Sequence, residues 1–179
     1  MNKNKIVILL AVTALLSSSI GVQIQAANGI AVVTGWDLVD SGKHMDYTVD
    51  TKYDGYIKGA ADTWNNYLGN QVIRKDSGST VNDCVIDDVY HDDVTWVGRT
   101  VQTPAGELIA GYIHLNTYYM DDLSTTKKIL VIKHEFGHSL GCDENDCSDL
   151  NIMYPDLLYS NINLTIHDKA SVDLAKKSW

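Results

Sequence analysis

Two histidines and a glutamate are the residues best suited to chemistry in this sequence. His134 and His138 are four residues apart, and Glu135 directly follows the first of them. In a helix, residues four apart lie on one face, about 6 Å apart along the axis. Both imidazoles can then bind one tetrahedral metal ion, and zinc is the usual partner of such a pair. Glu135 would lie beside the open position of the metal, where it can take a proton from water.

A glycine and two acidic residues follow this group. Gly141 comes three residues after His138 and can adopt the left-handed conformation that ends a helix. Glu144 comes three residues later and is the predicted third metal ligand, because zinc accepts carboxylate oxygen. Asp143 is the alternative third ligand. A further alternative is that both acids are solvated loop residues and the metal site is weak.

The segment that carries the histidines has the pattern of a buried helix. Residues 124–126 form a favourable helix start, and the apolar run Leu130-Val131-Ile132 predicts that the following residues are buried. Burying two histidines and a glutamate is costly unless they have a partner. These residue types indicate a metal ion as that partner.

Apolar spacing and turn residues predict the remaining elements. A helix is expected over 54–68, with Asp54 as its N-cap and Gly69 at its end. A last helix is expected to open at Thr165 and Asp168, which have the spacing of a capping box. Strands are expected over 36–39, 45–49, 71–75, 84–90, 95–103 and 107–116, with loops over 118–123 and 142–163.

The start of the chain has the composition of a secretory signal peptide. Lys3 and Lys5 precede an apolar run over 6–16, and small residues lead to a predicted cleavage point after Ala26. We therefore expect a signal peptide over 1–26 and one domain over 27–179. The apolar run is too short for a comfortable membrane span, so the expected product is secreted and has no stable membrane association.

Charge and cysteine content restrict the function further. With a formal net charge of −9, the chain is not expected to bind nucleic acid or anionic lipid through bulk charge. Export permits a disulfide bond, and their short separation favours Cys142 with Cys147, which leaves Cys84 as a free thiol. The alternative is three reduced cysteines.

The sequence over 134–155 resembles the metzincin zinc endopeptidases, and most closely their matrixin branch. The resemblance rests on the HExxHxxG pattern of residues 134–141 and on the later run Ile152-Met153-Tyr154-Pro155. It implies an α+β metzincin-like catalytic domain. That domain would have a twisted mixed sheet with one antiparallel edge strand, a zinc-site helix, a methionine turn and a C-terminal helix.

The resemblance also implies roles for the matching residues. His134 and His138 would be zinc ligands, and Glu135 would be the general base. Met153 would pack beneath the metal, and residues 154–159 would form the wall of the pocket that receives a substrate side chain. The strand over 107–116 resembles the edge strand on which these enzymes bind an extended peptide.

Glu144 departs from the family pattern, which usually has His and sometimes Asp as the third ligand. A carboxylate there makes bound water less acidic, which predicts a higher pH optimum. The family's calcium loops have no clear match, and a Ca²⁺ site is only a possible addition. Residues that could contribute to such a site are Asp87, Asp88, His91, Asp92 and Asp93, or Asp121 and Asp122.

Together these features predict a secreted, monomeric zinc endopeptidase. Zinc-activated water would attack a peptide bond of a peptide or protein substrate, and Glu135 would act as the base. Two alternatives remain: a catalytically idle metzincin-like module that binds a partner protein, or a zinc amidase that acts on a non-protein substrate such as a cell-wall amide.

Overall fold

A five-stranded mixed sheet forms the centre of the fold. The computed structural model describes residues 22–26, 29–78, 82–156 and 163–179. The strand order is β4-β3-β5-β7-β6, and only β6 runs antiparallel to its neighbour. The strands are β3 (Met45–Asp50), β4 (Ile73–Lys75), β5 (Cys84–Val89), β6 (Gly98–Gln102) and β7 (Gly111–Asn116). This arrangement confirms the predicted mixed sheet with one antiparallel edge.

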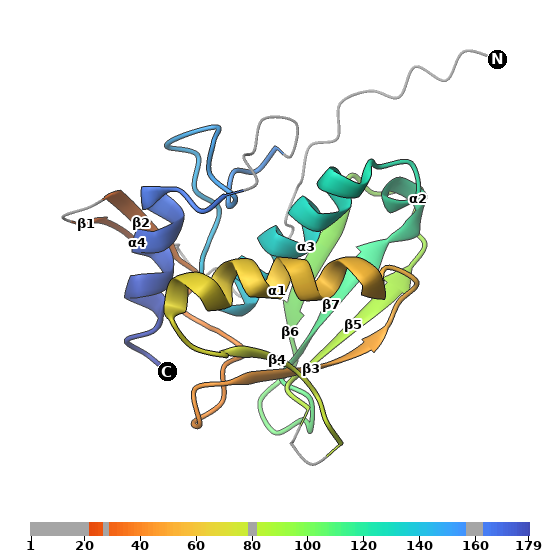
Figure 1. The fold of residues 1–179 in the computed structure, drawn as a ribbon, viewed down its shortest axis with the longest axis horizontal. Coiled ribbons are helices and arrows are strands. Elements are labelled where there is room, and N and C mark those ends of the chain that lie inside the picture. Colours follow the sequence, from red (N-terminus) through yellow and green to blue (C-terminus); the bar gives the residue numbers. More distant parts are fainter. Residues whose placement is uncertain (1–21, 27–28, 79–81, 157–162) are drawn as a thin grey trace.

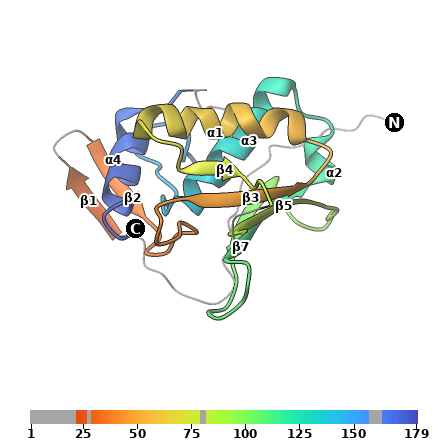
Figure 2. The same ribbon diagram turned by 60° about the horizontal axis from the view of Figure 1, so that its bottom comes forward.

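Two long helices, α1 (Asp54–Leu68) and α3 (Thr125–Ser139), cover the same face of the sheet (Figure 2). They pack against each other, and the indole N–H of Trp64 on α1 donates to the backbone oxygen of Lys133 on α3 at 2.9 Å. Phe136 points from α3 into the same core and is fully buried. The half of α3 that carries the histidines is therefore held by apolar packing from the sheet below and from α1 beside it.

Both helices begin and end close to the predicted residues. Gly69 has φ 65°, so it ends α1 in the left-handed conformation that glycine adopts without strain. The side chain of Ser124 caps α3 by accepting from the backbone N–H of Lys127. The prediction of Asp54 as N-cap was wrong, since Tyr53 holds that position. Asp54 lies in the first turn, where its charge still favours the helix N-terminus.

Three local predictions differ from the structure. Residues 36–39 form no strand. A hydrogen bond to the end of α3 holds this segment instead, because the Leu38 N–H donates to the backbone oxygen of Ser139 at 2.8 Å. The predicted loop over 118–123 begins with a one-turn helix, α2 (Thr117–Met120), capped by the side chain of Asn116. The strand predicted over 107–116 starts only at Gly111. Short elements of this kind depend on tertiary contacts more than on local composition.

The predicted edge strand was also wrong. β7, which contains most of the segment over 107–116, lies inside the sheet between β5 and β6. The antiparallel edge strand is β6 (Gly98–Gln102). Alternation of side chains along β7 correctly indicates that Ile113 and Leu115 face the buried side. The same alternation does not indicate which strands are neighbours, so it cannot distinguish an edge strand from an internal one.

A smaller unit lies at one end of the molecule, on the opposite side from α2 (Figure 1). It contains the antiparallel hairpin β1 (Val22–Ala26) and β2 (Gly29–Val33) and the last helix α4 (Ile166–Ala175). The capping box of Thr165 and Asp168 is present as predicted. The predicted cleavage point after Ala26 falls at the end of β1. No helix of the described residues is long and apolar enough to cross a membrane.

Candidate metal centre

The two histidines of α3 present a pair of nitrogen atoms to each other. His134 and His138 are buried, and their Nε2 atoms are 3.1 Å apart. His134 Nδ1 is 2.8 Å from the backbone oxygen of Ile152, and His138 Nδ1 is 2.9 Å from that of Cys142. A carbonyl oxygen can only accept, so each Nδ1 carries a proton, and Nε2 is the atom of each ring that can bind a cation once it is unprotonated.

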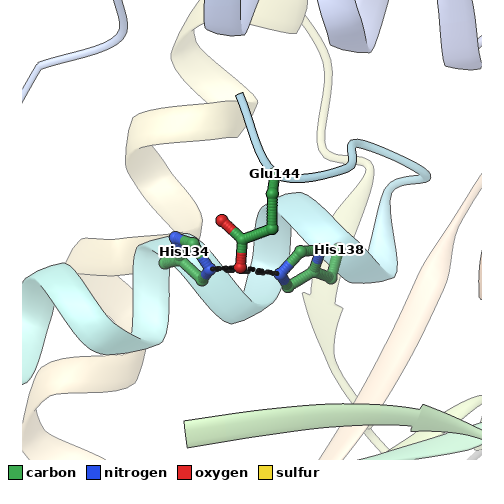
Figure 3. Close-up of side chains that lie close together, drawn as sticks. All are labelled: His134, His138 and Glu144. Carbon is green, nitrogen blue, oxygen red and sulfur yellow. Dashed lines mark hydrogen bonds and ion pairs between the residues drawn. The ribbon is translucent and has the colours of Figure 1, made fainter. Parts of the chain in front are cut away.

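Glu144 completes the group from the other side. It reaches from the loop after α3 to a place between the two histidines (Figure 3). Its Oε1 atom is 3.4 Å from His134 Nε2 and 3.7 Å from His138 Nε2. Both of its carboxylate oxygens are enclosed and have no hydrogen-bond partner among the described residues. An enclosed carboxylate is costly unless a protonated histidine or a metal ion offsets its charge, and a metal ion could bind all three side chains.

The distances fit a tetrahedral zinc site. Ligands bound at about 2.0–2.1 Å in tetrahedral geometry are roughly 3.3 Å apart, close to the three separations between His134, His138 and Glu144. A second group of the described residues, Asp40, Asp46 and Asp83, also has its oxygens close together. Its Asp46 carboxylate is already paired with the Arg74 guanidinium at 2.6 Å and 2.8 Å, so the histidine group is the better metal site.

The charges of His134 and Glu144 affect how a metal ion could bind. Burial by itself disfavours a charged imidazole, but the Glu144 carboxylate outweighs it and raises the pKa of His134 to about 9. In turn, burial would raise the pKa of Glu144, but the histidines lower it to about 2. Without a metal, His134 therefore holds a proton at neutral pH. A binding metal ion must displace this proton, so metal binding is coupled to pH.

Asp143, the alternative ligand, has a different place. Its Oδ1 atom accepts from the backbone N–H of Glu144 at 2.8 Å, and its own N–H donates to the oxygen of Val32 at 3.0 Å. Asp143 is not in the group whose ligand atoms converge. It stabilises the turn that presents Glu144.

Glu135 is fully buried beside the histidines. Its Oε2 atom accepts from the hydroxyl of Thr100 on β6 at 2.8 Å, while its Oε1 atom has no hydrogen-bond partner among the described residues. Gly98 on the same strand approaches Oε1 closely. The edge strand therefore contacts the predicted base, and this contact was not expected from the sequence.

The sequence analysis also missed Asn145, which holds the metal-site loop in place. This buried side chain donates to the oxygen of Ile30 on β2 at 2.9 Å, and its backbone N–H donates to the oxygen of Met153 at 2.8 Å. The Asn151 amide in turn donates to the backbone oxygen of Asn145 at 2.9 Å. Asparagine in a polar run reads as a turn former, and only its burial in the fold distinguishes it.

The methionine turn lies directly beneath α3. Met153 is fully buried, and a side chain at Gly137 would overlap its sulfur. The carboxylate of Asp168 accepts from the backbone N–H groups of Ile152 at 3.0 Å and Met153 at 3.1 Å. Asp168 was predicted only as a helix cap, and it also joins α4 to the turn. Because the backbone oxygen of Ile152 also binds His134, α4 helps to orient a predicted metal ligand.

The predicted disulfide between Cys142 and Cys147 was wrong. Cys142 is buried and Cys147 is exposed, and all three cysteines are free. Cys142 points into the core, where burial raises the pKa of its thiol. Cys147 points to Asn145, whose Oδ1 is 2.6 Å from its sulfur. A short separation in sequence brings the two backbones near but does not direct their side chains toward each other.

Other predicted sites are not assembled. Asp87 pairs with His114 at 2.6 Å, and Asp121 pairs with Lys52 and Tyr53, so these acids have protein partners. Among the described residues, the acids suggested for calcium form no group that could share a cation. Of the predicted substrate wall, 154–156 are described and 157–159 lie outside the described residues.

Comparison with solved structures places this arrangement among known folds. Archaemetzincin from Methanopyrus kandleri matches with a TM-score of 0.51 and 13% identity, over 78% of this chain and 97% of that one. Metalloproteinase-II from Bacteroides fragilis matches with a TM-score of 0.44 and 14% identity, over 89% of this chain and 58% of that chain. The GM1-bound ECX AB5 holotoxin matches with a TM-score of 0.44 and 18% identity, over 64% of this chain and 57% of that chain. This chain therefore covers little more than half of the length of metalloproteinase-II and of the matched holotoxin chain.

No protein-family model matches the sequence, and no curated protein matches it either. At such low identity, a match in three dimensions speaks for the fold and not for the activity. The chain has a metzincin-like fold, with His134, His138 and Glu144 gathered at the helix that carries the histidines.

Proposed function

We propose that this protein is a secreted zinc-dependent endopeptidase, similar to the matrixin branch of the metzincins. One observation carries the proposal: the two Nε2 atoms and an enclosed carboxylate converge at separations that suit ligands of zinc. Zinc bound by His134, His138 and Glu144 would polarise a substrate carbonyl and make water more acidic.

The protein's own groups divide the remaining work. Glu135 would take a proton from the attacking water and pass it to the leaving amine. β6 is the last strand of the sheet, so its outer edge offers backbone N–H and C=O groups to an extended peptide. This role passes from the segment over 107–116 to β6, because β6 is the edge strand and contacts Glu135. Strand pairing requires a peptide backbone, which favours peptide or protein substrates.

Metal content and hydrolysis together test the proposal. The purified domain over 27–179 is expected to hold about one zinc ion per chain and to cut casein, an unstructured protein. Glu135→Ala is expected to keep the zinc and lose the hydrolysis, whereas Glu107→Ala, which changes an exposed acid, keeps both. Glu135→Ala with wild-type activity would contradict the mechanism.

Two other outcomes identify the alternatives. Zinc binding without peptide hydrolysis would favour an amidase for a non-protein substrate, such as a cell-wall amide. Absence of zinc binding would favour an idle module that binds a partner protein.

We further propose that residues 1–26 direct export and that the domain over 27–179 acts outside the cell as a monomer. N-terminal sequencing of the exported protein tests the cleavage after Ala26. Light scattering of the same material tests the monomer. An exported chain that still carries residues 1–26 would contradict the processing.

A further inference from the structure

The strand β6 has a second relation to the site besides its open edge. It lies against α3, and two of its residues, Gly98 and Thr100, face the Glu135 side chain. We propose that Thr100 is a positioning residue that holds Oε2 of Glu135, so that Oε1 is the atom that accepts the proton from water. The inference rests on the proposed endopeptidase function and assigns a task to a strand outside the metal-binding motif.

The hydrogen bonds of Thr100 support this assignment. Its hydroxyl is 2.8 Å from Glu135 Oε2 and 3.0 Å from the backbone oxygen of Glu135. A hydroxyl has one proton, and a bond to an ionised carboxylate is stronger than one to a carbonyl. Both residues are buried, with Thr100 6% and Glu135 0% exposed, so the bond is shielded from bulk solvent. The bond fixes the carboxylate and the helix turn that carries it.

Gly98 restricts the other oxygen. A Cβ atom at this position would lie 2.7 Å from Glu135 Oε1, 2.9 Å from Glu135 Cγ and 2.8 Å from a methyl group of Val131. Because glycine has no side chain, the Glu135 carboxylate can lie directly against β6 at this position. Oε1 is enclosed there and has no hydrogen-bond partner among the described residues. It keeps its full capacity to accept a proton, while Oε2 is already engaged.

Positioning by β6 explains how one oxygen is selected. A carboxylate on a flexible side chain would alternate between two equivalent oxygens and several rotamers. With Oε2 held, only a small part of this freedom remains, and a base held in a productive place contributes more to the rate. The proton moves from water to Oε1 and later to the leaving amine, while Thr100 donates throughout and exchanges no proton.

Paired substitutions at position 100 test the proposal. Thr100→Val keeps the shape and removes the hydroxyl, whereas Thr100→Ser keeps the hydroxyl. Loss of a hydrogen bond to a charged group corresponds to roughly a 10- to 100-fold fall in kcat for Thr100→Val. KM for a fluorogenic peptide cut by the wild type should stay within about twofold, because substrate binding is unchanged. Thr100→Ser should stay within about threefold of the wild-type kcat, since its hydrogen bond remains.

Two readouts separate positioning from a merely structural role. Zinc content should be close to wild type in both variants, and crystal structures should show Glu135 turned away in Thr100→Val alone. Gly98→Ala should also displace Glu135 and lower kcat, whereas Gly59→Ala on the exposed face of α1, where nothing lies within 4 Å, should not.

A zinc-loaded Thr100→Val enzyme with wild-type kcat, or with Glu135 in its original place, would overturn the inference. A wild type that binds zinc but cuts neither casein nor any peptide would instead contradict the proposed function. In that case the crystal structures of the Thr100 variants still decide whether Thr100 positions Glu135.

Discussion

The two halves of the metal centre are built in different ways. The helical half takes His134, Glu135 and His138 from one continuous element, and the spacing of these residues alone brings them together. The loop half places Glu144 through contacts with segments far away in the chain. Its neighbour Asn145 binds Ile30 on β2, more than a hundred residues earlier.

The helical donors are therefore ordered by their own helix, whereas the loop donor Glu144 is ordered by other parts of the fold. Helix hydrogen bonds already order the backbone of the helical donors, so they lose little freedom when a metal binds. The loop donor relies on β2, the methionine turn and α4 to hold it, through Asp143, Asn145 and Asp168. Substitutions in the helical half should therefore remove a function outright. Substitutions in the loop half should weaken metal affinity and stability in graded steps.

The largest effect is expected from His138→Ala. If roughly 10 kcal/mol of zinc-binding free energy is shared among three protein donors, losing one lowers the affinity on the order of 100- to 1,000-fold. Competition with a chromogenic chelator measures this change, and casein hydrolysis should disappear with the metal. His44→Ala, which changes a histidine outside the site, serves as the control. Unchanged affinity in His138→Ala would refute the proposed ligand set.

The third ligand gives the next test. Glu144→Gln removes the charge at nearly constant shape and should lower zinc affinity by about 100-fold. Asp143→Asn should lower it by at most about tenfold, because Asp143 only supports the turn. The same chelator competition compares the two variants directly. Equal losses would remove the distinction between a ligand and its support.

Asn145→Ala tests whether the loop half is held from a distance. It removes the Asn145 amide donor from the part-buried oxygen of Ile30, which should lower the free energy of unfolding by about 1–3 kcal/mol. Zinc affinity should fall by about 10- to 100-fold, since Glu144 is the next residue. Urea denaturation and chelator competition measure the two effects, with the exposed Asn70→Ala as control. Loss of stability with full zinc affinity would show that the loop holds Glu144 without this support.

The smallest effect concerns the metal-free protein. Because the pKa of His134 is raised from 6.5 to about 9 in the fold, its protonation stabilises the folded state below pH 6.5, and this stabilisation is lost as the pH rises through 9. Zinc-free wild type should lose about 2 kcal/mol of unfolding free energy between these limits. Glu144→Gln, which lacks the opposing charge, should lose much less. Urea denaturation in a chelator across this range provides the measurement.

The sequence predicted the helical half well because its signals are local. The histidine spacing, the Ser124 cap and the Thr165–Asp168 capping box each act within a few residues. The spacing to Glu144 was also informative, because the chain turns back shortly after Gly141, which has φ 92°. These features depend on the helix period and on the conformational freedom of glycine.

The remaining features depend on which segments become neighbours in the fold. The segment over 107–116 was expected to be the edge strand because of the resemblance to the metzincins, but the whole sheet places β7 between β5 and β6. The predicted pairing of Cys142 and Cys147 failed because Cys142 is packed in the core, whereas the Cys147 sulfur contacts Asn145. Asn145 and Thr100 are ordinary polar residues whose importance follows from burial next to the site.

The contact between Met153 and Gly137 makes the site sensitive to oxidation. The methionine sulfur fills the place of a side chain at 137, and no part of Met153 is exposed to solvent. Oxidation to the sulfoxide would add an oxygen where a methyl group already does not fit, and would place a strongly polar group in an apolar setting. An oxidant can reach this sulfur only when the turn opens, and the turn could not then close in the same way. Molecules that have opened in an oxidising medium would thus lose the orientation of His134 until the sulfoxide is reduced, because His134 depends on the same turn.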